Sequence, residues 1–224
     1  MPQVVIGIVG YYAFIRGYPL GPELMARLQS EPWPDDVDIR DMNWGPIAIV
    51  QDFQSASGTP ERVVLVGAVD RNLEHGTVTC RRWSGGALET AEVQRRVFEA
   101  VTGVISLDNL LVIGAHFGIW PRELITVEAQ LSENSLSDLL LTEIDAGGAS
   151  AKGRVIGEQP LTADNDAIVN RIVRSARRAA LDGVESLADL SLLTADQLTP
   201  PARVTHHRFT NGAGAEAGDH RAWS

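Results

Sequence analysis

The chain has 224 residues, of which 44% are hydrophobic and 21% charged, and its formal net charge is -10. This length and composition are typical of one α/β domain of ordinary size, alone or with a tail. Because an acidic surface repels phosphate groups, the charge argues against a general affinity for nucleic acid or for anionic membranes.

The sequence also predicts the compartment in which the protein works. The single cysteine, Cys80, excludes an internal disulfide and fits a reducing environment. The N-terminus lacks the basic flank of a signal peptide. The longest apolar stretch, Val4 to Ile15, is shorter than the ~18 residues that a membrane helix needs. We therefore expect a soluble protein of the cytoplasm.

Short apolar runs predict the strands of a sheet. Val4–Gly10 and Arg62–Val69 are β-branched runs typical of strands buried on both faces. Val37–Met42 predicts a strand between them. Gly76–Trp83 follows the second run through a turn, which predicts an antiparallel partner. Arg122–Leu131 predicts the last strand.

Apolar residues at helical spacing occupy the intervals between these strands. Pro22 suits a first helical turn because its missing N–H is not needed there. Ser106 or Asp108 can cap the fourth helix, whereas Thr162 can cap the fifth and Gly183 can end it. The fifth helix has an apolar stripe made of Ile168, Ile172, Val173, Ala176 and Ala180. The predicted helices are Pro22–Ser30, Trp44–Gln54, Glu89–Val101, Ser106–Gly118 and Leu161–Leu181.

This order of elements predicts a three-layer α/β/α fold, with a mostly parallel five-stranded sheet that carries one antiparallel strand. We expect one domain over residues 1–193, in which residues 132–160 form an insertion or a flexible loop. Residues 194–224 lack an apolar period and are rich in glycine, alanine and proline, which predicts a disordered tail. In such sheets ligands bind beyond the carboxyl ends of the strands, so the loops after Gly10, Arg40 and Val66 are the candidate site.

Five segments, taken in order, carry a family resemblance. They are "GIVGYYAFIRGYPLGPELMARL", "VDIRDMNWGPIAI", "RVVLVGAVDRNLEHGTVTCRR", "GIWPRELITVEA" and "QPLTADNDAIVNRIV". Together they resemble the strands, loops and helices of the [NiFe]-hydrogenase maturation endopeptidases. Those enzymes trim a C-terminal peptide from the hydrogenase large-subunit precursor once nickel has been inserted. The resemblance implies an α/β fold and, as partner, a [NiFe]-hydrogenase large subunit or another maturation factor.

The three positions at which that family holds its metal differ in this chain. The opening loop reads "GYPLG", with Gly17 and Tyr18 where the family has acids. The central strand reads "LVGAV", with Gly67 in place of an aspartate, and Asp108 or a neighbour stands where a histidine opens a helix. Gly67 has no side chain, and a tyrosine with a free pKa of ~10 is a poor ligand. The resemblance therefore implies the family's frame without its metal site.

The first functional hypothesis is a non-catalytic protein that assists hydrogenase maturation or assembly by binding. Aromatic side chains beyond the carboxyl ends of strands suit contact with another chain. We expect Tyr18, Asp41, Asn43, Trp44 and Gly45 to form the partner-binding surface. Alternatively, Trp44 fills the groove that the substrate peptide occupies in the family.

The second hypothesis is an active endopeptidase whose metal-sensing residues have moved to Asp70, Asp108 and His116. The structural alternative is that Asp70 begins a turn, Asp108 caps a helix and His116 packs near a helix end. In neither hypothesis does the chain hold a cofactor of its own, because nickel comes only with the partner. Cys80 lies in mid-strand, where a buried thiol is more usual than a nucleophile. A third hypothesis, a small-molecule binder, lacks the Gly-x-Gly-x-x-Gly spacing of dinucleotide sites.

Overall fold

The structure of the protein is a computed structural model. It describes residues 3–13, 15–86, 88–101, 106–131, 160–186 and 190–198. The predicted insertion at 132–160, except Pro160, and residues 199–224 of the predicted tail lie outside this part of the chain. No helix of the described ranges combines the length and the apolarity that crossing a bilayer requires.

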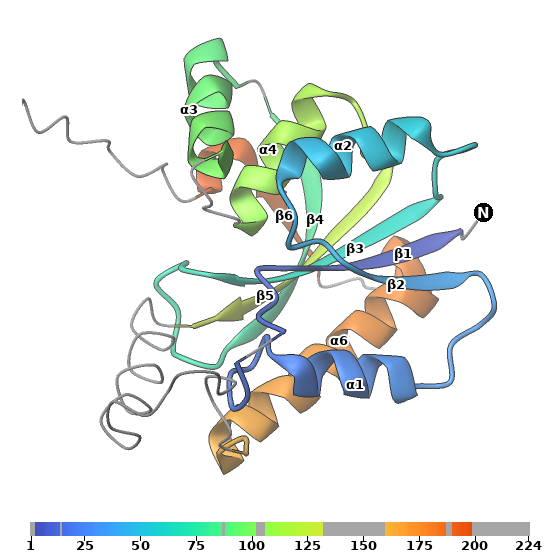
Figure 1. The fold of residues 1–224 in the computed structure, drawn as a ribbon, viewed down its shortest axis with the longest axis vertical. Coiled ribbons are helices and arrows are strands. Elements are labelled where there is room, and N and C mark those ends of the chain that lie inside the picture. The colour runs from blue at the N-terminus through green and yellow to red at the C-terminus, as the bar shows by residue number, and fades with distance from the viewer. Residues whose placement is uncertain are drawn as a thin grey trace, which may run out of the picture.

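The described residues form a six-stranded sheet in the order β2-β1-β3-β5-β4-β6 (Figure 1). Strands β1, β2, β3 and β5 pair in parallel, β4 pairs with β5 in the antiparallel direction, and β6 lies parallel to β4. The strands are β1 (Val4–Val9), β2 (Val37–Asp41), β3 (Arg62–Val69), β4 (Val78–Gly85), β5 (Glu123–Gln130) and β6 (Ser191–Thr194). The predicted parallel sheet with an antiparallel strand is confirmed, but the predicted count of five strands is wrong because β6 adds a sixth.

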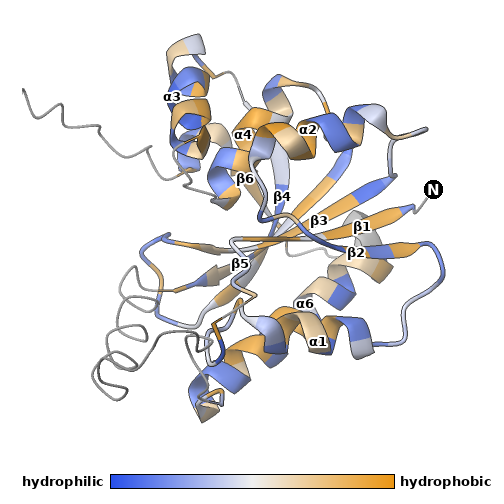
Figure 2. Ribbon diagram, in the orientation of Figure 1, coloured by the Kyte–Doolittle hydropathy of each residue, from blue (hydrophilic) through white to orange (hydrophobic). Residues whose placement is uncertain are grey.

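Helices cover both faces of the sheet, which confirms the predicted three layers (Figure 1). One face carries α1 (Pro22–Ser30) and α6 (Ala163–Ser186). The other carries α2 (Pro46–Ser55), α3 (Thr90–Val101) and α4 (Leu107–His116). In Figure 2 the central strands are mostly hydrophobic, as expected for a sheet between two helical layers. The core therefore lies on both sides of the sheet.

Local signals of the sequence mark the starts of α1, α4 and α6. Pro22 occupies the first turn of α1, and the Ser106 side chain accepts a hydrogen bond from the Asn109 amide at the start of α4. Thr162 Oγ1 accepts from the Asn165 amide at 3.2 Å, as a helix cap does. Helix α6 continues to Ser186, so the predicted stop at Gly183 is wrong. The predicted stripe of α6 is fully buried against the sheet.

Strand β6 belongs to the folded domain, although its last residue, Thr194, is where the sequence predicts the tail to begin. Leu193 is 0% exposed and lies opposite Trp83 of β4, whereas its neighbour Leu192 is 56% exposed. A 3-10 turn over Ala195–Gln197 follows, and Leu198 packs into the same cluster as Leu193. Thr194–Leu198 are therefore part of the domain and not of a tail.

We expect Leu193→Ala to destabilise the protein by about 2–5 kcal/mol, because it opens a cavity beneath β6. Leu192→Ala, one residue away on the same strand, is expected to change stability by less than about 0.5 kcal/mol, since its side chain is mostly in water. Urea unfolding of the two variants measures the difference. Equal costs would contradict the pairing of β6 with β4.

Candidate functional site

The carboxyl ends of β1, β2 and β3 lie at one edge of the sheet, because these strands pair in parallel. The loop after β1 begins at Gly10, whose φ of 71° is in the left-handed region that glycine tolerates. Met42 follows β2, and its amide donates to Ile8 of β1 at 2.9 Å. Asp70 follows β3. The predicted candidate residues gather in these loops and in α4, which begins nearby.

Gly67, where the family resemblance expects an aspartate, is covered by an apolar side chain. It lies near the end of β3, beside Val9 of β1 and Glu128 of β5. A Cβ atom on Gly67 would be 3.0 Å from Cβ of Leu107, which is 1% exposed. Leu107 is the first residue of α4, so it is the neighbour of Asp108 that faces Gly67. Leu107 occupies the space over this strand end, so a side chain at position 67 would have to displace it by a few tenths of an ångström.

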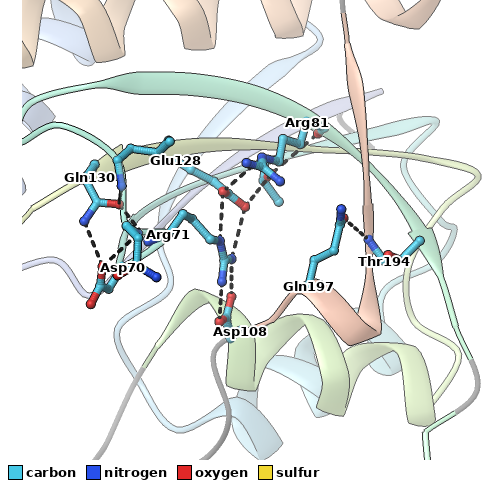
Figure 3. A network of polar contacts seen from close by, with 11 residues as sticks. Asp70, Arg71, Arg81, Asp108, Glu128, Gln130, Thr194 and Gln197 are labelled. Atoms are coloured by element: carbon cyan, nitrogen blue, oxygen red, sulfur yellow. Dashed lines mark hydrogen bonds and ion pairs between the residues drawn. The ribbon is translucent and has the colours of Figure 1, made fainter.

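The Asp108 side chain points instead to Arg71, which follows β3. Together with Glu128 of β5 they form a buried ionic cluster (Figure 3). The Arg71 guanidinium donates to both carboxylate oxygens of Asp108, at 2.8 and 2.6 Å. It also donates to both oxygens of Glu128 on β5, at 3.2 and 3.3 Å. Arg81 of β4 lies 3.5 Å from Glu128 on its other side. The Arg71 guanidinium is the cation that lies between these two carboxylates.

This cluster is buried. The side chains of Arg71, Asp108 and Glu128 are 5%, 8% and 0% exposed. Burial alone lowers the pKa of Arg71, but the hydrogen bonds and charges of Asp108 and Glu128 outweigh it and raise the pKa above its ordinary value. Thr126 adds a hydrogen bond to Glu128 at 3.1 Å. The carboxylate of Asp108 is therefore held in a structural ion pair.

Asp70 organises the turn that follows β3. Its Oδ1 accepts hydrogen bonds from Nε2 of Gln130 at 3.0 Å and from the Asn72 amide at 3.1 Å. These two hydrogen bonds lower the pKa of Asp70. Oε1 of Gln130 accepts in turn from the Arg71 amide at 2.7 Å. Asn72, with φ of 55°, makes the tight bend that this arrangement requires.

The third residue of the hypothetical relocated set, His116, lies elsewhere. It is exposed at the far end of α4, with its ring 5.2 Å from that of Phe117. Eight residues of helix, or ~12 Å, separate it from Asp108. The structure therefore brings Asp70 and Asp108 to the same Arg71 but does not bring His116 to them. Within the described ranges, no group of three histidine, cysteine or acidic side chains is placed to hold a metal ion.

The opening loop turns Tyr18 inward. Gly17 has φ of 76°, and its carbonyl accepts a hydrogen bond from Asn165 of α6 at 2.8 Å. Tyr18 is 6% exposed, and its ring packs edge-on against Tyr12 with centroids 5.5 Å apart. Tyr18 was predicted to lie on the partner-binding surface. The structure corrects this, because Tyr18 packs in the core beneath the loop and only Tyr12 is on the outside.

We expect Tyr18 to make the protein less stable at alkaline pH. Burial, and to a smaller degree Tyr12, raise the pKa of Tyr18 to about 12, whereas an unfolded tyrosine titrates near ~10. The unfolded chain therefore loses this proton first, so the stability is complete below pH ~10 and falls as the pH rises toward 12. The expected loss is about 2–3 kcal/mol. Urea unfolding across this range should show a steeper fall for wild type than for Tyr18→Phe, and equal slopes would contradict a buried phenol.

The loop after β2 presents Trp44 to solvent. The side chain of Asp41 accepts a hydrogen bond from the Asn43 amide at 2.8 Å, and its carbonyl accepts from the Trp44 indole. Met42 is buried beneath the loop, whereas Trp44 is 52% exposed. Gly45 is exposed and precedes the first turn of α2. Trp44 is therefore a surface residue, and the alternative in which it fills a groove does not agree with its exposure.

The sequence carries only weak signals for Glu128, Gln130 and Arg71, which it does not predict to lie at the site. Glu128 and Gln130 stand among the apolar residues Leu124, Ile125, Val127 and Ala129 of a buried strand, and a charge at such a position needs a buried partner. Arg71 is that partner, but nothing in the sequence specifies the pair.

Burial raises the pKa of the Cys80 thiol, which is the opposite of what a reactive thiolate needs.

No family model and no curated protein matches the sequence. Among solved structures, the chain is similar to the hydrogenase 2 maturation peptidase from a Thaumarchaeota archaeon, at 16% identity and a TM-score of 0.42 over 79% of this chain and 96% of that one. It is similar to the hydrogenase-maturating endopeptidase HybD from E. coli, at 17% identity and a TM-score of 0.44 over 79% of this chain and 90% of that one. It is also similar to the [NiFe] hydrogenase maturation protease HybD from Thermococcus kodakarensis, at 14% identity and a TM-score of 0.42 over 79% of this chain and 98% of that one.

Proposed function

We propose that this chain is a non-catalytic relative of the hydrogenase maturation proteases, which assists maturation or assembly of a [NiFe]-hydrogenase large subunit by binding it. The observation that carries the proposal is the Leu107 side chain packed on Gly67. It supports the loss of the metal site because both positions would need polar side chains to hold an ion. The inward Tyr18 supports the same conclusion at the third position.

The proposed binding surface is the last residue of β2 and the loop after it, made of Asp41, Asn43, Trp44 and Gly45. Exposed tryptophan is among the residues that contribute most to protein–protein binding. The hydrogen bonds of Asp41 hold this loop in one shape before a partner arrives, which lowers the entropy cost of association. In this proposal the chain contributes no metal, and any nickel belongs to the bound large subunit.

The alternative, an endopeptidase with relocated residues, has less support. Asp70 and Asp108 would have to leave their hydrogen bonds with Gln130 and Arg71 to reach an ion. The bidentate ion pair with Arg71 is buried, so breaking it is costly. His116 would have to come from the opposite end of α4. No observation in the described part of the chain favours that rearrangement.

The proposal predicts that Trp44→Ala weakens binding to a nickel-loaded large-subunit precursor by about tenfold or more. Biolayer interferometry with immobilised precursor measures the affinity. Phe98→Ala is the matched control, because Phe98 on α3 is 55% exposed and lies outside the proposed surface. It should change the affinity by less than about twofold. Equal losses in both variants, or no binding by the wild type, would contradict the proposal.

A further inference from the structure

The outward face of α6 carries three arginines at helical spacing. Arg171, Arg174 and Arg178 are all exposed, and their spacing of three and four residues places them on one side of the helix. They span ~10 Å along the helix axis. The apolar stripe of α6 is buried on the opposite side, and of the three arginines Arg171 also donates a hydrogen bond to the turn between β3 and β4. We call these three residues the arginine face.

Most other arginines of the described ranges have a carboxylate partner, and the arginine face does not. The paired residues are Arg27, Arg40, Arg62, Arg71, Arg81, Arg95, Arg96 and Arg177. Arg171 donates to the Gly76 carbonyl at 2.9 Å and Arg174 to the carbonyl of Asn170 in its own helix at 3.3 Å. Within the described ranges, no carboxylate lies at ion-pair distance from any of the three.

This concentration of positive charge stands out because the whole chain carries a net charge of -10. Acids outnumber bases in the chain, yet none of them neutralises the arginine face within the structure described. Arginine binds carboxylates through two parallel N–H groups, which suits recognition of acidic side chains on another protein. Nucleic acid fits less well, because the net negative charge of the chain repels a long polyanion.

We propose that the arginine face docks an acidic segment of a partner protein. This surface differs from the loop of Trp44: α6 covers one face of the sheet, whereas Trp44 leads into α2, which covers the other (Figure 1). The inference therefore does not depend on the proposed role in hydrogenase maturation. It gives the protein a second interaction surface, which is positively charged although the whole chain has a net negative charge.

Fluorescence anisotropy with a labelled oligoglutamate peptide at low ionic strength tests this proposal. Wild type should bind the peptide, and added salt should weaken the binding because exposed charges are screened. Arg174→Glu with Arg178→Glu should reduce the affinity by about tenfold or more. The matched control reverses Arg16 and Arg122, which are exposed, lie outside α6 and have no ion pair in the described ranges. It changes the net charge equally and should retain the binding.

The outcomes separate this proposal from its alternatives. No binding of oligoglutamate by the wild type would overturn it, as would equal losses in the α6 variant and its control. Tighter binding of a labelled oligothymidylate than of the peptide would overturn it in favour of nucleic acid. Thermal unfolding checks the fold of each variant. Should the charge reversal lower the melting temperature, Arg174→Gln with Arg178→Gln removes the charges without repulsion and must also lose binding.

Discussion

Replacing Gly67 by aspartate is expected to destabilise the protein by about 3–5 kcal/mol. The new Cβ would lie 3.0 Å from the Cβ of Leu107, a distance at which one of the two must move. The carboxylate would then be buried against leucine with no cation beside it, because Arg71 already binds Asp108 and Glu128. This substitution introduces the residue that the resembled family has here, at a position that Leu107 covers in this fold.

Two companion variants separate the steric part of this cost from the charge. Gly67→Ala adds only the Cβ and should cost about 1–2 kcal/mol. Gly67→Asp in a Leu107→Ala background relieves the contact, so the added cost of the aspartate should be smaller there than in wild type. Urea unfolding of the four proteins completes the cycle. A Gly67→Asp variant as stable as wild type would show that Leu107 does not occupy this space.

Replacing Arg71 by methionine is expected to cost about 3–5 kcal/mol, because it leaves the carboxylates of Asp108 and Glu128 buried without their main cation. Methionine keeps most of the volume of the arginine stem, so the loss reports charge more than packing. Arg81 reaches only Glu128, at 3.5 Å, and so does not replace Arg71 beside Asp108. Circular dichroism during urea unfolding at neutral pH measures the loss.

Arg95→Met is the control for this prediction. Arg95 also pairs with a carboxylate, Glu92 at 2.6 Å, but its side chain is 62% exposed. Water screens such a pair, so its removal should change stability by less than about 1 kcal/mol. Adding Asp108→Asn and Glu128→Gln to Arg71→Met should recover part of the stability, because the uncompensated charges are then gone. Equal costs for Arg71→Met and Arg95→Met would contradict the burial of the cluster.

Much of the fold could be predicted from local patterns. The apolar run Arg62–Val69 coincides with β3, and the apolar stripe of α6 is buried as its spacing predicts. Strand β6 could not be predicted in the same way. It has four residues, only one of which is buried, and it forms by pairing with β4, more than a hundred residues earlier. A short edge strand of this kind carries almost no local signal.

The candidate site was predictable where it depends on the absence of a side chain. Gly67 could be recognised in the sequence because glycine has no side chain with which to ligate a metal in any fold. Its cover, Leu107, could not, since the contact joins β3 to α4 across forty residues. Tyr18 was expected outside and lies inside, because the backbone of the opening loop decides the direction of its side chain. The Arg71 cluster is likewise a product of tertiary structure.

The most direct test of the proposal that this protein binds a large-subunit precursor without cutting it is the mass of that precursor. A nickel-loaded large-subunit precursor is incubated with the wild-type protein, and the C-terminus of the precursor is analysed by intact-mass spectrometry. We predict that the precursor binds and keeps its full mass. Removal of a C-terminal peptide by the wild type, and its absence when Asp70→Ala and Asp108→Ala are introduced, would contradict that prediction and identify an active endopeptidase.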